Sequence, residues 1–263
     1  VVLVIPREYT VPKAVKRKRE GRRMKIGVLN DIHGNLPALE AVLTFFREQG
    51  CDEIIGTGDV LTIGPDSIEC LHRLQSLPHF HMVSGNHERC FFGGFGPPYP
   101  STMQVKEAAH HQWVFDQLSR EDRQWLEALP RRLERRLTGG GQEITAAFVH
   151  YPMDRIGNFL PNFEPSKQAL DAAFEGEPAQ WVFYGHDHRD SEFTGRRRYI
   201  NLGPMGCPGT GAAAPVGWIT ADARGVRLER LLIPYDKAET IRHLKAKNTP
   251  DHEQVIRWFF GGE

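Results

Sequence analysis

Five positions along the chain place metal-ligating side chains directly after short apolar segments. The segments KIGVLN, EIIGTG, FHMVSG, TAAFV and WVFYG directly precede, in this order, Asp31, Asp59, Asn86 with His87, His150, and His186. Short runs rich in β-branched and aromatic residues predict buried strands. Ligands in open α/β sheets bind where the carboxyl ends of the strands leave the sheet. We therefore expect all five positions to meet at one site.

The types and spacing of these side chains indicate a metal centre. Asp31 and His33 are two residues apart, as are His186 and His188, so each pair can face one ion from an extended segment. Taken alone, Asp31 and His33 would more often be a helix cap and a surface residue than metal ligands. Five such positions in order favour metal ligation, and a mixture of carboxylate, amide and imidazole donors suits Mn²⁺, Fe or Zn²⁺.

The elements that would position these residues alternate between strands and helices from Met24 onward. A helix is expected after Asn35, its N-cap, with Pro37 in the first turn and Gly50 at its end. A helical insert is expected over about residues 91–130, and a helical segment interrupted near Pro250 over 237–260. The pattern predicts an α/β (α+β) fold with two packed sheets and helices outside, in a single domain over residues 24–263.

Composition narrows the class of protein. The chain has 263 residues, of which 40% are hydrophobic and 25% charged, as in ordinary globular domains. No apolar stretch approaches the roughly 20 residues that cross a bilayer, and the N-terminus lacks the features of a signal peptide. We therefore expect a cytoplasmic protein without a membrane partner. The four cysteines show no CxxC spacing, so we expect thiols rather than disulfides.

The net charge of zero conceals an uneven distribution. Residues 1–23 carry eight of the 33 basic residues but only two of the 33 acidic ones, so the rest of the chain is mildly acidic. We expect this basic N-terminal extension to be disordered or not native. A domain that grips a long nucleic acid usually carries the opposite sign of charge, so we do not expect a nucleic-acid partner.

The motifs DIHGN, GTGD, GNHE, a single His after a strand, and GHDH together resemble the calcineurin-like metallophosphoesterase superfamily. The resemblance spans residues 24 to about 233 and is nearest to the compact prokaryotic, phosphodiesterase-like branch. It implies an αββα four-layer sandwich of two mixed β-sheets flanked by helices. It also implies hydrolysis of a small phosphate ester, a phosphodiester or a nucleotide, through a hydroxide that bridges two metal ions.

The resemblance assigns a role to each motif residue. One ion would be held by Asp31, His33 and His188, the other by Asn86, His150 and His186, and Asp59 would bridge them. We favour Mn²⁺ as the cofactor over Fe or Zn²⁺. His87 would act as the catalytic proton donor to the leaving group. The substrate would contact Asn86, His87 and Arg89.

Two other functions stay open on the sequence alone. One is a non-catalytic metal-binding scaffold for protein assembly, which the complete set of motif residues disfavours. The other is a nuclease, which the mildly acidic body disfavours. The oligomeric state is not indicated.

Overall fold

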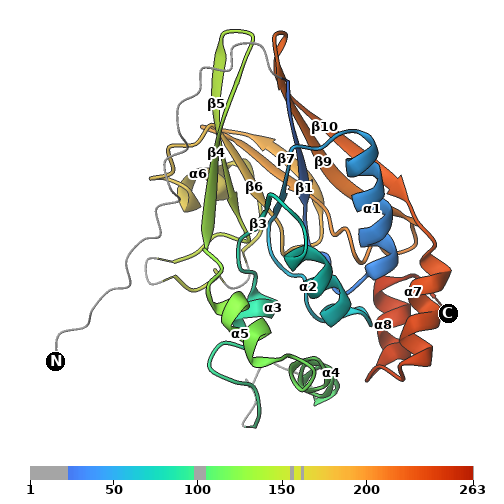
Figure 1. Cartoon of the computed structure of the whole chain (residues 1–263). Coiled ribbons are helices and arrows are strands. Elements are labelled where there is room, and N and C mark those ends of the chain that lie inside the picture. The colour runs from blue at the N-terminus through green and yellow to red at the C-terminus, as the bar shows by residue number, and fades with distance from the viewer. Residues whose placement is uncertain (1–22, 98–104, 155–156, 161–162, 263) are drawn as a thin grey trace.

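The computed structural model describes residues 23–97, 105–154, 157–160 and 163–262. These residues form ten strands and eight helices around two β-sheets (Figure 1). The basic extension predicted for residues 1–23 lies outside the described residues except for residue 23. The middle of the predicted helical insert, residues 98–104, also lies outside them.

Each sheet has five strands and mixes parallel with antiparallel pairs. The first sheet has the order β10 (Gly225–Pro234), β9 (Ala213–Asp222), β1 (Met24–Leu29), β2 (Glu53–Gly56) and β3 (Phe80–Met82). The second has the order β4 (Arg132–Gly139), β5 (Gln142–Val149), β6 (Trp181–Tyr184), β8 (Arg198–Leu202) and β7 (Asp190–Thr194). The parallel runs are β1–β2–β3 and β5–β6–β8. The carboxyl ends of these parallel strands point the same way, so the chain segments that follow the strands meet at one end of the molecule.

The central strands are buried on both faces, which explains their nearly continuous apolar sequences. The edge strands β4, β7 and β10 instead alternate with exposed positions. Successive side chains point to opposite faces of a strand, so Val28 packs between the sheets while Leu29 packs under the helices of the first sheet. In the second sheet Phe148 likewise packs between the sheets and Val149 faces outward. The apolar runs therefore supply the two inner layers.

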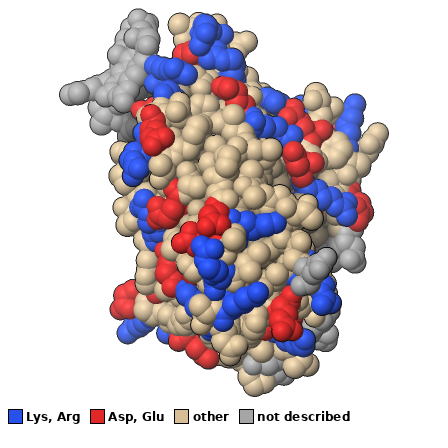
Figure 2. Space-filling model, turned by 90° about the vertical axis from the view of Figure 1, so that its right-hand side faces the viewer, with Lys and Arg blue, Asp and Glu red and all other residues tan. Residues whose placement is uncertain are grey.

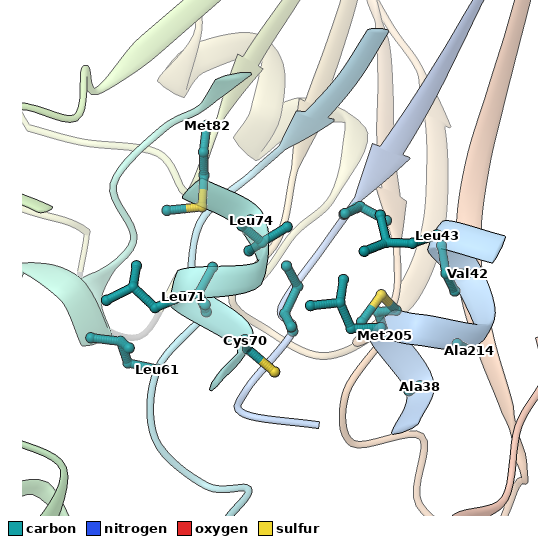
Figure 3. Packing of buried hydrophobic residues seen from close by; sticks show 14 of the residues in the cluster. Ala38, Val42, Leu43, Leu61, Cys70, Leu71, Leu74, Met82, Met205 and Ala214 are labelled. Carbon is teal, nitrogen blue, oxygen red and sulfur yellow. The ribbon is translucent and has the colours of Figure 1, made fainter. Parts of the chain in front are cut away.

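Helices form the two outer layers. The first sheet is covered by α1 (Leu36–Glu48) and α2 (Ser67–Gln75), whose apolar side chains interlock above it (Figure 3). The second sheet is covered by α6 (Lys167–Ala173). Asn35 caps α1 as predicted, because its side chain accepts a hydrogen bond from the Ala38 backbone. The predicted αββα sandwich is confirmed.

The remaining helices lie at the end of the sandwich where the parallel strands finish (Figure 1). They are α3 (Asn86–Arg89), α4 (Val105–Phe115), α5 (Arg120–Glu127), α7 (Lys237–Ala246) and α8 (His252–Phe259). The last two form the helical segment predicted near the C-terminus, with the expected break at Pro250. None of the described helices is long and apolar enough to cross a membrane. All four cysteines are free thiols.

Candidate metal centre

The backbone at the strand ends is left-handed at most of the predicted ligands. The φ angles are 47° at Asp31, 45° at His33, 55° at Asp59, 76° at His186 and 54° at His188. Non-glycine residues in this region cost about 1–3 kcal/mol each and persist where the surroundings hold them. Such strain gathers at functional sites, because the turns direct side chains to one point rather than to the most relaxed position.

Asp59 lies at the centre of the cluster and is almost fully buried. Its Oδ2 atom lies 3.3 Å from His150 Nε2, 3.8 Å from His87 Nε2 and 3.9 Å from His33 Nε2. These imidazoles follow β5, β3 and β1, so one carboxylate oxygen meets side chains from both sheets. An anion in this place is suited to bridge two cations.

The other predicted ligands form one group on each side of Asp59. On one side, Asn86 Oδ1 lies 2.8 Å from His150 Nε2 and 2.6 Å from His186 Nδ1. On the other side, His33 Nε2 and His188 Nε2 are 2.9 Å apart. Asp31 is fully buried, and its carboxylate accepts hydrogen bonds of 3.0 and 3.2 Å from the backbone of His186, two residues before His188 in sequence. All seven predicted ligands therefore lie at one place.

Backbone carbonyls fix which nitrogen of two histidines faces Asp59. His33 Nδ1 lies 3.1 Å from the Leu61 oxygen, and His150 Nδ1 lies 2.9 Å from the Thr57 oxygen. A carbonyl only accepts, so each Nδ1 carries a proton and donates it. The Nε2 atoms that face Asp59 are then free to offer a lone pair to a metal ion.

The electrostatics of the cluster fit cations. Burial lowers the pKa of His33 and His188 and lowers that of His186 to about 4, so these imidazoles are neutral, as ligands must be. Burial, together with the nearby Asp59 charge, raises the pKa of Asp31 to about 7. His150 differs, because the Asp59 carboxylate outweighs the effect of burial and raises the pKa of this imidazole to about 9. A protonated His150 therefore offsets part of the carboxylate charge, and divalent ions would displace its proton and supply the counter-charge instead.

The donor set thus fits metal binding, and one triad within it, Asp59, His150 and His186, has ligand atoms close enough together to hold an ion. Two further triads each add a residue from outside the set, Cys207 beside His33 and His188, and His87 beside His33 and Asp59.

Glu88 organises the loops that carry these ligands, a role that sequence reasoning missed. Its fully buried carboxylate accepts backbone N–H bonds of 2.8 Å from Asp59, Val60 and Gly85, and a fourth of 3.3 Å from Leu61. Burial and the Asp59 charge raise its pKa. The only sequence signal was its position in GNHE, directly after two predicted site residues.

His87, the predicted proton donor, lies beside the ligand groups. Its Nδ1 is 2.5 Å from the Thr62 hydroxyl, and its ring stacks on His111 of α4 with centroids 5.4 Å apart. Burial, with a contribution from His111, lowers the pKa of His87 to about 3, so the resting imidazole is neutral. Its Nε2 is as near to Asp59 as that of His33, so the distances also allow ligation.

Arg89, the predicted substrate contact, packs on aromatic rings next to the metal centre, and its contact with a substrate stays a prediction. Its guanidinium sits over the rings of Phe92 and Phe159, at 5.9 and 5.6 Å from their centroids. It is not among the described residues that line the cavity at the metal centre.

A cavity of about 320 Å³ opens onto the ligand cluster. Its floor includes Asp59, Asn86, His87, His186 and His188. Its walls are formed by α4, and by α8 with the residue before it. The arrangement is therefore a buried ligand cluster at the bottom of a small-molecule pocket.

A two-sheet sandwich with Asp, Asn and His ligands at its strand ends defines a metallophosphoesterase-like class of protein. The calcineurin-like phosphoesterase superfamily domain matches residues 24–224, and the chain belongs to this superfamily. The resemblance seen in the sequence is thereby confirmed.

Several known proteins are similar to the chain. It is 30% identical to an uncharacterized protein of Methanocaldococcus jannaschii over 164 residues, 62% of either chain. It is 48% identical to phosphodiesterase YfcE of Escherichia coli over 42 residues, 16% of this chain and 23% of that protein. The chain thus matches less than two thirds of the length of these relatives.

Two solved structures share the fold over nearly their whole length. A metallophosphoesterase from Sphaerobacter thermophilus has a TM-score of 0.66 and 26% identity, covering 90% of this chain and 98% of that one. A hypothetical protein from Pyrococcus horikoshii has a TM-score of 0.69 and 19% identity, covering 91% and 99%.

Proposed function

We propose that the chain is a two-metal phosphoesterase that hydrolyses a small phosphate ester, either a phosphodiester or a nucleotide. The observation that carries this proposal is the position of the Asp59 carboxylate between two groups of ligands. Asp31, His33 and His188 would hold one ion, and Asn86, His150 and His186 the other. The donor set suits Mn²⁺, Fe or Zn²⁺, and we favour Mn²⁺.

The charge of the ligands supports an anionic substrate. The carboxylates of Asp31 and Asp59 would balance only half the charge of two divalent ions, so the centre would attract a phosphate. A pair of such ions supplies a nucleophile from water and stabilises the phosphoryl oxygens during displacement. The left-handed turns and the carboxylate of Glu88 would hold the ligand atoms in place for this task.

His87 would donate a proton to the leaving group. The Thr62 hydroxyl lies 2.6 Å from the Leu61 carbonyl, to which it donates, so it accepts from His87 Nδ1–H. Nε2 of the neutral ring therefore carries a lone pair toward the site. An anionic phosphate beside it would favour its protonation, after which Nε2–H could pass a proton to the departing alkoxide.

The cavity supports a small ester rather than a nucleic acid. Its volume of about 320 Å³ is near the lower limit of small-molecule sites, which are roughly 300–1,000 Å³. Among the described lining residues the only Lys or Arg is Lys106, which pairs with Asp251 at 3.0 Å. On the face shown in Figure 2, basic and acidic side chains are intermingled. These features disfavour the nuclease, and the similarity to phosphodiesterase YfcE supports a diester.

The test is a metal-dependence assay with two aryl phosphates. Protein stripped with EDTA should gain activity when Mn²⁺ is added, and p-nitrophenyl phosphate and its bis-ester should reveal the preferred class. A His150→Asn variant should lose one ion, whereas the control His79→Asn, at an exposed histidine, should retain both. Two bound ions without turnover of either ester would contradict the proposal and favour the scaffold.

A further inference from the structure

The wall of the cavity formed by α8 lies outside the part of the chain that matches the superfamily. That match ends at residue 224, whereas α8 spans His252–Phe259. The floor of the cavity therefore comes from the shared domain, and this wall comes from a segment beyond it. Residues in such a position can distinguish one phosphate ester from another.

Hydrogen bonds join the end of α8 to the first residue of α7 and to residues 209–210. Lys237 Nζ donates to the carbonyls of Thr210 and Phe260, at 2.9 and 3.0 Å. The Gly209 backbone donates to the Phe259 carbonyl at 3.1 Å. The Phe259 ring meets the edge of His188, with centroids 6.3 Å apart. The wall is thus preformed relative to the ligands, which limits the entropy lost when a substrate binds.

Trp258 is the large apolar side chain of this wall that stays exposed at the cavity. It lines the cavity and is 59% exposed, whereas the neighbouring Val255 is buried against α7. Ile63 and Phe259 extend the apolar wall toward the metal centre. A cavity with ligands for phosphate on its floor and an indole on its wall offers two different kinds of contact to one molecule.

We propose that Trp258 binds a planar aromatic group of the substrate, such as a nucleobase, while the phosphate binds at the metal centre. This inference rests on the proposed function and narrows its substrate class to phosphate esters of nucleosides. Aromatic side chains stack on any base through its π-face. Gln254 and the Lys106–Asp251 ion pair at the same cavity supply polar groups for the sugar or the edge of the base.

Two ligands that differ only in the base test the inference. Isothermal titration of the full Mn²⁺-loaded chain would compare AMP with ribose 5-phosphate, with chromatography confirming that both stay intact. Stacking on an aromatic side chain predicts about fivefold to 100-fold tighter binding of AMP. Trp258→Ala should bring the two dissociation constants within about twofold of each other, by weakening AMP alone. Trp258→Phe should keep part of the preference.

The control and the contrary outcomes separate this inference from the proposed function. Leu232→Ala changes an exposed apolar residue on β10, outside the described cavity lining, and should leave the preference intact. Equal binding of the two ligands by the wild type, or a preference that survives Trp258→Ala, would overturn the inference while hydrolysis of the bis-ester continues. Binding of neither ligand, with no Mn²⁺-dependent turnover, would overturn both.

Discussion

Replacing Glu88 by Gln should destabilise the protein and loosen the metal centre, although the side chains have nearly the same shape. In the wild type, Oε1 accepts from the backbones of Val60 and Leu61, and Oε2 accepts from those of Asp59 and Gly85. A glutamine amide has one oxygen and one NH₂ group. Whichever way it turns, two backbone N–H groups would face another donor.

The cost follows from that geometry. Leaving a buried donor without a partner costs about 1–3 kcal/mol, so two of them should lower the free energy of unfolding by about 2–6 kcal/mol. This is a large share of the total stability of a domain, which is typically about 5–15 kcal/mol. Because the same loops carry Asp59 and Asn86, the affinity for metal should fall as well.

Urea denaturation of the metal-free protein measures the stability term, and equilibrium dialysis against Mn²⁺ measures the affinity term. The matched control is Glu48→Gln, an exposed glutamate on α1, which should change the free energy of unfolding by less than about 0.5 kcal/mol. A Glu88→Gln variant as stable as this control, with unchanged metal content, would refute the role assigned to the carboxylate.

Three further predictions concern the site and its surroundings. Asp59→Asn should bind fewer than two ions by metal analysis, because the shared anion is weakened; two tightly bound ions with full activity would contradict this. His87→Ala should keep its metal and lose about 10²–10⁴-fold in turnover of alkyl esters but much less with p-nitrophenolate as leaving group; equal losses would indicate phosphate binding instead. Burial lowers the pKa of His110 to about 4 from 6.5. The unfolded chain therefore binds more protons at this residue between these pH values, so His110 alone should lower the free energy of unfolding by about 3 kcal/mol from pH 7 to 4. Over the same pH range, the free energy of unfolding of His110→Gln should fall by about 3 kcal/mol less than that of the wild type. An equal fall in both proteins would exclude His110 as a source of the pH dependence.

The fold was predictable from the sequence because strands and helix ends are each marked by residues that are close together in the chain. The apolar runs mark strands buried on both faces, and Asn35 with Gly50 marks the ends of α1. The αββα arrangement and the family also followed from motifs that stand at fixed places in the chain. The predicted ligands meet because parallel strands direct their ends to one side.

The residues that could not be predicted act through contacts distant in sequence. Glu88 was visible in its motif, but its four backbone donors come from two separate loops. Trp258 belongs to no motif, and its position at the cavity depends on how the last helix packs. The position of the Arg89 guanidinium over two phenylalanine rings is likewise a contact that only the tertiary structure determines.

The second sheet enters the chain as an insertion within the first, since β4–β8 lie between β3 and β9 in sequence. Each proposed ligand set therefore takes side chains from both sheets, with His188 completing one set and Asn86 the other. A chain in which a single sheet has formed would present only a fragment of either coordination shell. Uptake of two tightly held ions would then require that both sheets have formed and packed against each other. Metal content would therefore measure the fraction of molecules that have folded completely.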